Sequence, residues 1–350
     1  MKFSAGISLF AAVASAISVD LAKRDTPLDV KLEMVGNTAV KASITNTGAT
    51  DLKVFKTGTF LDENSATEKV AIYQGGNKLE FDGIRLRVMT TGLDEEAFQI
   101  IPAGETVEAT FDVGQVYDLS AGGKYDVVSL GAVSYAEANT TELAGVYSVA
   151  GSTVAAEVDG AAASAVRRRF HKRIDVQSDC TGTKLTASNT AISNCRSLAA
   201  AAATAASSGA AAKVTEYFKS STTSTRSTVA AVFQRVATEC GSTSTGVSDL
   251  YCSDVYGACS SGVLAYTLPS QSYMVNCNLY FTALSALTRT CHGQDQATTT
   301  LHESTHLSQI AGTDDYGTYG YSGVQSLSAA QNLRHADTYA LFANAIYVGC

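Results

Sequence analysis

Hydrophobic and polar residues alternate along much of the first half of the chain. Clear examples are residues 28–35, 39–44 and 105–111, with turn residues between such runs at 46–48 and 75–77. Successive side chains of a β-strand point to opposite faces of its sheet, so this alternation predicts strands with one buried face. Short strands that recur at this spacing are typical of an antiparallel β-sandwich.

The spacing changes in the second half, where apolar residues recur every three or four positions. This pattern predicts helices over residues 197–218, 227–238, 298–309 and 328–348. The first of them contains a weak point at residues 207–209, which read Ser-Ser-Gly. The last begins at a serine, a residue type suited to capping a helix.

Two apolar runs in the second half are too short for helices. Residues 263–267 and 272–276 flank Pro269-Ser270 and predict a small β-hairpin. Such a hairpin either offers an edge strand to an extended peptide or only completes the core, and both readings stay open. The chain is therefore expected to be α+β, with a β-sandwich-like N-terminal region before a mainly α-helical domain that holds a small sheet.

Length and charge limit the classes of function. With 350 residues the chain can form two domains, each with its own core. Its 25 basic residues against 33 acidic ones give a net charge of −8, which argues against nucleic acid as the main partner. We expect a monomer.

The N-terminus has the three parts of a secretory signal peptide. Lys2 supplies the positive charge, residues 7–13 the apolar run, and residues 14–16 or 16–18 the small-residue cleavage site. No other stretch approaches the roughly 18 apolar residues of a membrane-spanning helix. Residues 1–18 are thus predicted to be a signal peptide, and the product is expected to be secreted with no membrane partner.

All eight cysteines lie in the second half, from Cys180 onward. An even number confined to one half of a secreted chain indicates four disulfides in one domain. Zinc ligation is the weaker reading, because the sequence contains no C-x-x-C pair. Eight cysteines allow 105 pairings, so the connectivity does not follow from the count.

A basic cluster separates the two halves. Residues 167–173 contain five basic residues in seven, ending in Lys172-Arg173. A solvated linker would explain the cluster, but its position favours a processing site cleaved after this pair. We therefore expect a β-rich pro-region at 19–173 and a mature domain at 174–350.

A glycosylation sequon stands at Asn139-Thr140-Thr141, which predicts a surface loop carrying a glycan on Asn139.

The chemistry is concentrated in His302-Glu303-Ser304-Thr305-His306, which reads H-E-x-x-H. Histidines four residues apart on a helix lie on one side and can bind one metal ion. The glutamate beside the first histidine then reaches the metal-bound water and can act as general base. A helix with two unrelated histidines is the alternative.

A catalytic zinc ion needs a third protein ligand, and elimination narrows the choice. No glutamate or methionine follows His306, and neither the glycine nor the third histidine of the extended H-E-x-x-H-x-x-G-x-x-H motif is present. The remaining candidates after His306 are Asp314, Asp315, His335, Asp337 and Cys350.

Residues 312–320, Gly-Thr-Asp-Asp-Tyr-Gly-Thr-Tyr-Gly, resemble the G-T-x-D-x-x-Y-G signature of the deuterolysin family. These fungal zinc endopeptidases are called aspzincins, because an aspartate is their third zinc ligand. The resemblance implies Asp315 as that ligand. The chain departs from the signature by one extra residue between Asp315 and Tyr319.

The resemblance extends to the whole layout, which implies a signal peptide, a pro-region removed at Lys-Arg, and a mature domain from Ile174 to the final cysteine. Residues 335–341 also look like the C-terminal helix of the family. The order of six cysteines implies three disulfides and leaves two cysteines for a fourth. The implied pairs are Cys180–Cys252, Cys259–Cys277, Cys291–Cys350 and, by remainder, Cys195–Cys240.

The resemblance also assigns roles around one zinc ion. His302, His306 and Asp315 would hold the metal, with Glu303 as general base. Tyr319 would donate a hydrogen bond to the oxyanion, with Tyr316 and Tyr321 as rivals. Asp337 is either a carboxylate that orients a ligand histidine or an ordinary helix residue, and His335 and His292 are expected to be structural.

The expected function is that of a secreted zinc-dependent endopeptidase made as a proenzyme. Its partners would be protein substrates, the dibasic-specific processing protease, and its own pro-region as inhibitor or folding aid. The family leans toward basic protein substrates. The alternatives are a secreted zinc-binding antigen or adhesion module without catalysis, and a zinc exopeptidase.

Overall fold

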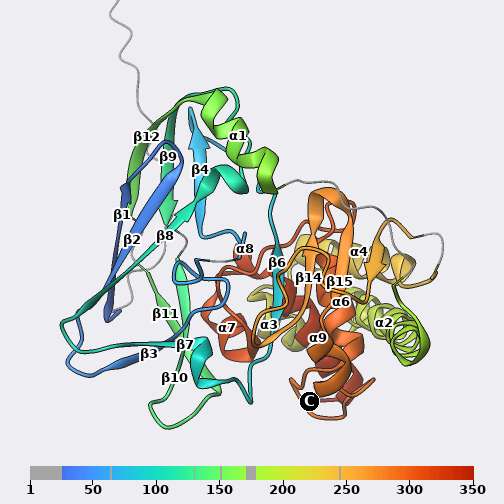
Figure 1. Cartoon of the computed structure of the whole chain (residues 1–350). Coiled ribbons are helices and arrows are strands. Elements are labelled where there is room, and N and C mark those ends of the chain that lie inside the picture. Colours follow the sequence, from blue (N-terminus) through green and yellow to red (C-terminus); the bar gives the residue numbers. More distant parts are fainter. Residues whose placement is uncertain (1–25, 64, 130, 150–151, 171–178, 244–245) are drawn as a thin grey trace, which may run out of the picture.

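Figure 1 shows the computed structural model of the chain, which falls into an N-terminal part rich in strands and a C-terminal part rich in helices. The structure describes residues 26–63, 65–129, 131–149, 152–170, 179–243 and 246–350. We call residues 26–170 the N-terminal part and residues 179–350 the C-terminal part. The expected signal peptide and Lys172-Arg173 lie outside the described residues.

The N-terminal part contains three antiparallel sheets, in the strand orders β1-β2-β8, β11-β10-β3-β7 and β12-β9-β4-β5. Their strands are β1 (Leu28–Met34), β2 (Ala39–Asn46), β3 (Leu52–Phe55), β4 (Val70–Gln74), β5 (Asn77–Lys78), β7 (Phe98–Ile101), β8 (Thr106–Asp112), β9 (Gly123–Ser129), β10 (Ala132–Ala136), β11 (Leu143–Ser148) and β12 (Thr153–Val158). Helix α1 (Gly160–Phe170) follows them.

The alternation expected from the sequence is seen directly in β2, where buried and half-buried side chains follow one another through the strand. Val40, Ala42 and Ile44 face the hydrophobic core, while the residues between them do not. The strands expected at 28–35, 39–44 and 105–111 are therefore confirmed, and a sandwich packing of the sheets stays a prediction. Asn139 lies in an exposed turn between β10 and β11.

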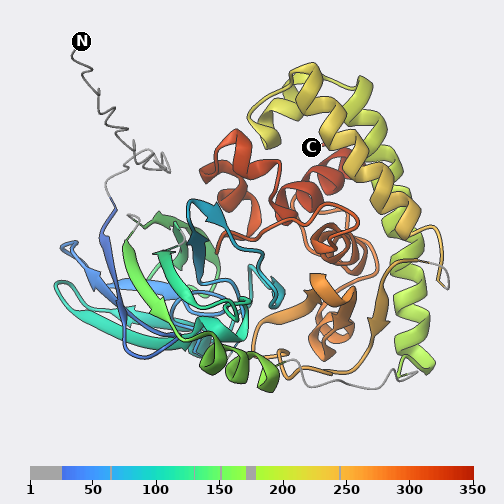
Figure 2. The ribbon, with the colours of Figure 1, turned by 90° about the horizontal axis from the view of Figure 1, so that it is seen from above.

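The C-terminal part holds the remaining helices of the described chain. They are α2 (Gly182–Ser208), α3 (Ala211–Phe218), α4 (Thr223–Glu239), α5 (Asn278–Ala283), α6 (Gln296–His306), α7 (Gly320–Ser326), α8 (Ala329–Asn332) and α9 (Ala336–Val348). Figure 2 shows α2, in light green, along the outer edge with α4 beside it. Short 3-10 turns occupy Glu95–Ala97, Val113–Gln115 and Pro269–Gln271.

Two expected helices differ from the prediction, each because the chain leaves helical geometry at a particular residue. The helix expected at 197–218 begins earlier, at Gly182, and is interrupted at Gly209, which caps α2 before α3 starts. The helix expected at 328–348 is divided into α8 and α9. The chain leaves helical geometry at His335, which forms a parallel bridge with Asp314.

The expected hairpin is confirmed by β14 (Val263–Leu268) and β15 (Tyr273–Asn276), which pair antiparallel. They belong to a sheet with the order β13-β15-β14-β6, in which β13 is Asp249–Tyr251. The fourth strand, β6 (Arg85–Val88), comes from the N-terminal part. It lies between the two parts in Figure 1, alongside β14.

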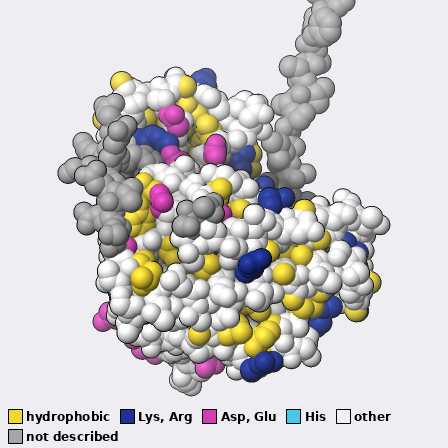
Figure 3. Space-filling view, turned by 90° about the vertical axis from the view of Figure 1, so that its right-hand side faces the viewer, with side chains coloured by type: hydrophobic (Ala, Val, Ile, Leu, Met, Phe, Trp, Pro, Cys, Tyr) yellow, Lys and Arg dark blue, Asp and Glu magenta, His cyan; other side chains and the backbone are white. Residues whose placement is uncertain are grey.

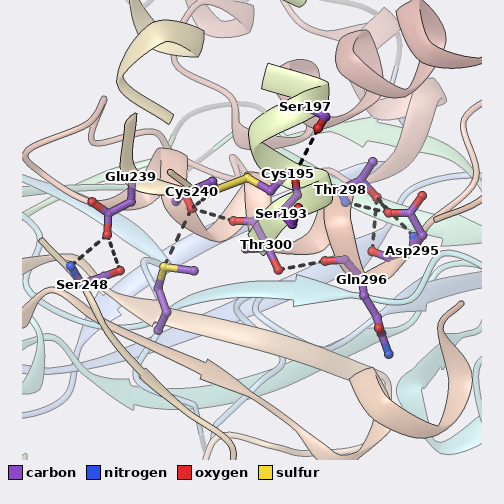
Figure 4. The surroundings of a disulfide bond; sticks show 12 residues. Ser193, Cys195, Ser197, Glu239, Cys240, Ser248, Asp295, Gln296, Thr298 and Thr300 are labelled. Atoms are coloured by element: carbon purple, nitrogen blue, oxygen red, sulfur yellow. Dashed lines mark hydrogen bonds between the residues drawn. A yellow bond between two sulfur atoms is a disulfide. The ribbon is translucent and has the colours of Figure 1, made fainter. Parts of the chain in front are cut away.

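Four disulfides lie within the C-terminal part, in the pairs implied by the resemblance. They join Cys180 to Cys252, Cys195 to Cys240, Cys259 to Cys277, and Cys291 to Cys350. Figure 4 shows the second of these, which ties the middle of α2 to the end of α4.

No helix among the described residues has the length and apolarity needed to cross a membrane.

Helix α6 is buried along its whole length, from Gln296 to His306. It packs against α2, α9 and β14 and also contacts β6 and α4, so neighbours surround it. The Asp295 side chain caps its N-terminus by accepting from the backbone N–H of Thr298 at 2.7 Å (Figure 4). The same carboxylate accepts from the Thr288 N–H at 2.8 Å, which joins the preceding loop to the helix.

Asp295→Ala should lower the free energy of unfolding by about 2 kcal/mol, because it removes a cap and leaves buried N–H groups without an acceptor. Urea denaturation of the full chain, followed by circular dichroism, measures this change. Asp249→Ala, at an exposed position of β13, is the matched control and should change stability by less than about 0.5 kcal/mol. Equal stability of the two variants would contradict the capping role.

Candidate metal centre

Three side chains converge in the C-terminal part. His302 and His306 come from α6, and Asp315 comes from the loop between α6 and α7. The Nε2 atoms of the two rings lie 3.0 Å apart, and Asp315 Oδ1 lies 3.4 Å from each of them. The histidines have no exposed surface and Asp315 is 6% exposed. This group has the residue types and spacing of a metal site.

Outer hydrogen bonds orient both rings. Nδ1 of His302 lies 2.9 Å from Asp337 Oδ1, and Nδ1 of His306 lies 2.9 Å from the carbonyl oxygen of Thr313. Since both partners are acceptors, each Nδ1 is the donor and each Nε2 is turned toward the centre of the group. This arrangement is the usual one for histidines that bind a metal through Nε2.

Two buried oxygen atoms in the site have no hydrogen-bond partner. They are Oδ1 of Asp315 and Oε1 of Glu303, although the other oxygen of Glu303 accepts from the Thr267 hydroxyl at 2.6 Å. Leaving such atoms unpaired is costly, and a cation among them removes the cost. Two imidazoles and one carboxylate match the three protein ligands of a catalytic zinc ion. The residues present therefore fit a zinc ion.

The charge balance of the site also favours a cation. Burial raises the pKa of Glu303 to about 7. Burial acts in the same direction on Asp315, but the charge of His306 reverses it and holds the Asp315 pKa well below its usual value. Burial lowers the pKa of His302, whereas Asp315 outweighs burial at His306 and raises its pKa. A bound metal ion would take the place of the proton on His306 and lower the Glu303 pKa.

The other candidate aspartates lie outside this group. Asp314 binds guanidinium groups, with Oδ1 2.6 Å from Arg85 Nη2 and Oδ2 3.4 Å from Arg334 Nε. Asp337 lies behind His302, on the Nδ1 side, and also accepts from the Gly320 N–H at 2.6 Å. Its position is that of a carboxylate which orients a ligand rather than one which binds the metal.

The candidate tyrosines fall into two groups. Tyr319 and Tyr316 both line a small cavity beside Asp315, and Tyr319 is 3% exposed. Tyr321 points elsewhere, because its hydroxyl donates to Glu216 at 2.9 Å and its ring stacks on His292. The structure thus leaves two tyrosines next to the metal group.

The remaining candidates have other partners. Nε2 of His335 lies 3.1 Å from the carbonyl of Thr318, and burial lowers the His335 pKa to about 4. His292 lies 2.6 Å from the hydroxyl of Tyr217, and Cys350 is in a disulfide. These residues have structural contacts away from the three converging side chains.

A segment of the N-terminal part also reaches the site, and the sequence analysis missed it. The Leu86 N–H donates to Asp315 Oδ2 at 3.3 Å. Arg87 forms an ion pair with Asp337, lies 3.2 Å from His302 Nδ1, and is 1% exposed. The available signal was the Arg-Leu-Arg run at 85–87, which places two basic side chains in the otherwise apolar segment 84–89.

Similarity to known proteins extends over the whole chain. A model of the deuterolysin metalloprotease (M35) family matches residues 1–350. The chain is 59% identical over 352 residues to a neutral protease 2 homolog of Colletotrichum graminicola and 56% identical over 357 residues to one of Phaeosphaeria nodorum, with 100% of both chains covered in each case.

Among solved structures, the chain is similar to a zinc peptidase from Grifola frondosa. The identity is 23% and the TM-score 0.40, over 47% of this chain and 97% of that one. The family match and the curated relatives confirm the resemblance found at residues 312–320. The chain therefore belongs to the deuterolysin metalloprotease (M35) family.

Proposed function

We propose that this metalloprotease is a secreted zinc-dependent endopeptidase, made as a proenzyme and acting on internal peptide bonds of proteins. The observation that supports it best is the convergence of His302, His306 and Asp315 beside the unpartnered Oε1 of Glu303. The three residues would hold one zinc ion. Secretion is supported by the four disulfides and the predicted signal peptide at 1–18.

A zinc ion held by His302, His306 and Asp315 would supply a Lewis acid for the scissile carbonyl and an acidified water. Glu303 would accept a proton at Oε1 and deliver it to the leaving amine, while the Thr267 hydroxyl donates to Oε2. Asp337 and the Thr313 carbonyl keep both ligand rings in orientation. Tyr319 donates a hydrogen bond to the developing oxyanion, a role supported by its place beside Asp315.

The pro-region at 19–173 keeps the enzyme inactive and assists its folding, and cleavage after Lys172-Arg173 releases the mature domain at 174–350. Support comes from burial, since His302, Glu303 and His306 have no exposed surface while the N-terminal part is in place. Tyr319 packs edge to face on Phe55 of the N-terminal part, with ring centroids 6.3 Å apart. Its proposed role therefore also requires removal of that part.

Basic protein substrates are preferred in this proposal. Two buried carboxylates near the metal group, Asp314 and Asp337, already bind the guanidinium groups of Arg85 and Arg87. Arginine or lysine side chains of a substrate would find the same partners. The exposed turn at Asn139 would carry a glycan on the pro-region.

Glu303→Gln should reduce turnover of casein by about 10²–10⁴-fold while zinc stays bound, because the amide cannot accept the proton of the water. Initial rates and metal content of the processed enzyme measure both effects. Wild-type activity should disappear with a zinc chelator and extend to end-blocked peptides, which an exopeptidase cannot cleave. Full activity of Glu303→Gln would refute the mechanism.

Asp315→Asn and Asp314→Asn are a matched pair of neighbouring substitutions. The first should reduce bound zinc from about one ion per chain to a small fraction, and the second should leave zinc content unchanged. Metal analysis after dialysis gives the result, with circular dichroism as the check of folding. Loss of zinc from Asp314→Asn but not from Asp315→Asn would show that Asp314, and not Asp315, is the ligand.

Replacement of Lys172 and Arg173 by alanine should leave the secreted chain uncut, because a dibasic-specific protease needs both charges. Mass spectrometry of the medium should show one species of full length minus the signal peptide, against a product starting at Ile174 for the wild type. The uncut chain should have less than about a tenth of the wild-type activity. Normal cleavage of this variant would move the processing site elsewhere.

A further inference from the structure

A cavity of about 330 Å³ lies behind helix α6, and its volume is in the range of small-ligand sites. Thr300 and Ser304 of α6 form part of its lining. Successive residues of an α-helix are rotated by about 100°, so these two side chains point away from the two histidines of the metal group. The cavity is therefore separate from the metal centre but in contact with the helix that carries it.

The wall of this cavity is acidic. It contains two carboxylates, Glu239 and Asp249, and no lysine, arginine or histidine among the described residues that line it. Glu239 is the last residue of α4, where the helix C-terminus adds partial negative charge. Its Oε1 accepts from the N–H and the hydroxyl of Ser248 (Figure 4), and its Oε2 accepts from the Val247 N–H at 2.9 Å. Oε2 has room for a further donor.

The floor of the cavity is apolar. Met274 belongs to the hydrophobic core of the C-terminal part, and Ile192 and Leu250 pack against that core. We call these three residues the apolar floor. The described chain leaves four large hydrophobic side chains exposed, and two of them, Leu185 at 43% and Val247 at 47%, border this cavity. Exposed apolar groups gathered at one concave place mark an interaction site.

The chain itself contains a segment that matches this site. Cys180 lines the cavity, and residues 174–178, outside the described ranges, shortly precede it. Five extended residues span up to about 17 Å, which is enough to enter. Their sequence is Ile-Asp-Val-Gln-Ser, and the two apolar side chains of an extended segment with this alternation share one side. Cleavage after Arg173 also gives Ile174 a free amino group, which is protonated near neutral pH.

We propose that the N-terminus created by cleavage after Arg173 docks in this cavity. The α-ammonium group of Ile174 pairs with Glu239, and the side chains of Ile174 and Val176 pack on the apolar floor. Before cleavage the Ile174 nitrogen is uncharged, because it is part of the peptide bond to Arg173, so the ion pair forms only in the cleaved chain. The inference rests on the proposed function, in its processing step, and assigns a binding site to the product of that step.

Docking connects processing to the metal-binding helix. The Ser304 hydroxyl lies 3.9 Å from Cys240 Sγ and 4.0 Å from Met274 Sδ. An aliphatic side chain on the apolar floor therefore contacts the residues that support the back of α6. It removes apolar surface from water and stabilises the arrangement of α4, α6 and the floor that binds it.

The reactivity of the Ile174 amino group tests the proposal in the secreted, processed chain. The probe is acetic anhydride at pH 7, and mass spectrometry of the N-terminal peptide gives the rate. Acetylation should be about tenfold slower than in the same chain unfolded in urea, because an ammonium ion paired with a carboxylate is held in its unreactive form. Glu239→Gln should remove most of this protection. Asp249→Asn, at an exposed position of the same wall, is the matched control and should change the rate less than about twofold.

Substitutions in the segment itself leave α4 and its loop unchanged. Val176→Asp should speed acetylation about fivefold and lower the Tm of the processed chain by about 3 °C, because a carboxylate does not enter an apolar site. Gln177→Ala, on the opposite side of the extended segment, is its control and should change neither value. In the uncut chain, with Lys172 and Arg173 replaced by alanine, Val176→Asp should have no effect on Tm.

Hydrogen exchange locates the docked segment. Backbone amides of 247–251 should exchange about fivefold faster in processed Val176→Asp than in the processed wild type, with no change at 336–348. Three results overturn the proposal: equal acetylation of the folded and unfolded chain, protection that survives both Glu239→Gln and Val176→Asp, or a processed chain that starts at another residue. Zinc-dependent proteolysis in any of these cases leaves the metal chemistry intact. A protected Ile174 in a chain without proteolysis contradicts the proposed function alone.

Discussion

The Asp337 carboxylate joins three segments that are distant in sequence. From the first turn of α9 it accepts from His302 on α6 and from the backbone of Gly320 at the start of α7, and it pairs with Arg87 on β6. It is fully buried, so its charge must be satisfied by these partners. The orientation of the His302 ring depends on this group, and so does the position of Arg87 from the N-terminal part.

Most of the site could be predicted because its signal is local. His302, Glu303 and His306 fall within one turn and a half of helix, and Asp315 follows nine residues after His306 in a recognisable motif. The disulfide pairs came from family resemblance, which carries long-range information that spacing alone lacks. Short-range patterns likewise predicted the alternating strands of the N-terminal part and the hairpin of β14 and β15.

The features that the sequence did not reveal are tertiary contacts. The contacts of Arg87 and Leu86 with the site span more than 200 residues, and the Arg-Leu-Arg run does not indicate which sheet its strand will join. Helix boundaries failed for a similar reason, since the break at His335 is set by pairing with the Asp314 loop. The distribution of surface charge does not identify a partner either. In Figure 3 charged side chains are scattered over the face shown instead of forming a patch that would identify a partner.

The shared sheet has a consequence for the reversibility of the proposed activation. While the linker is intact, β6 is tethered to β14, and its local concentration is fixed by the chain itself at roughly millimolar levels. The proposed cut after Lys172-Arg173 would turn the same contact into an association between two molecules. Its occupancy would then follow mass action, and dilution would weaken it without any further chemical change. The sheet of four strands would thereby couple the activity of the cleaved enzyme to its concentration.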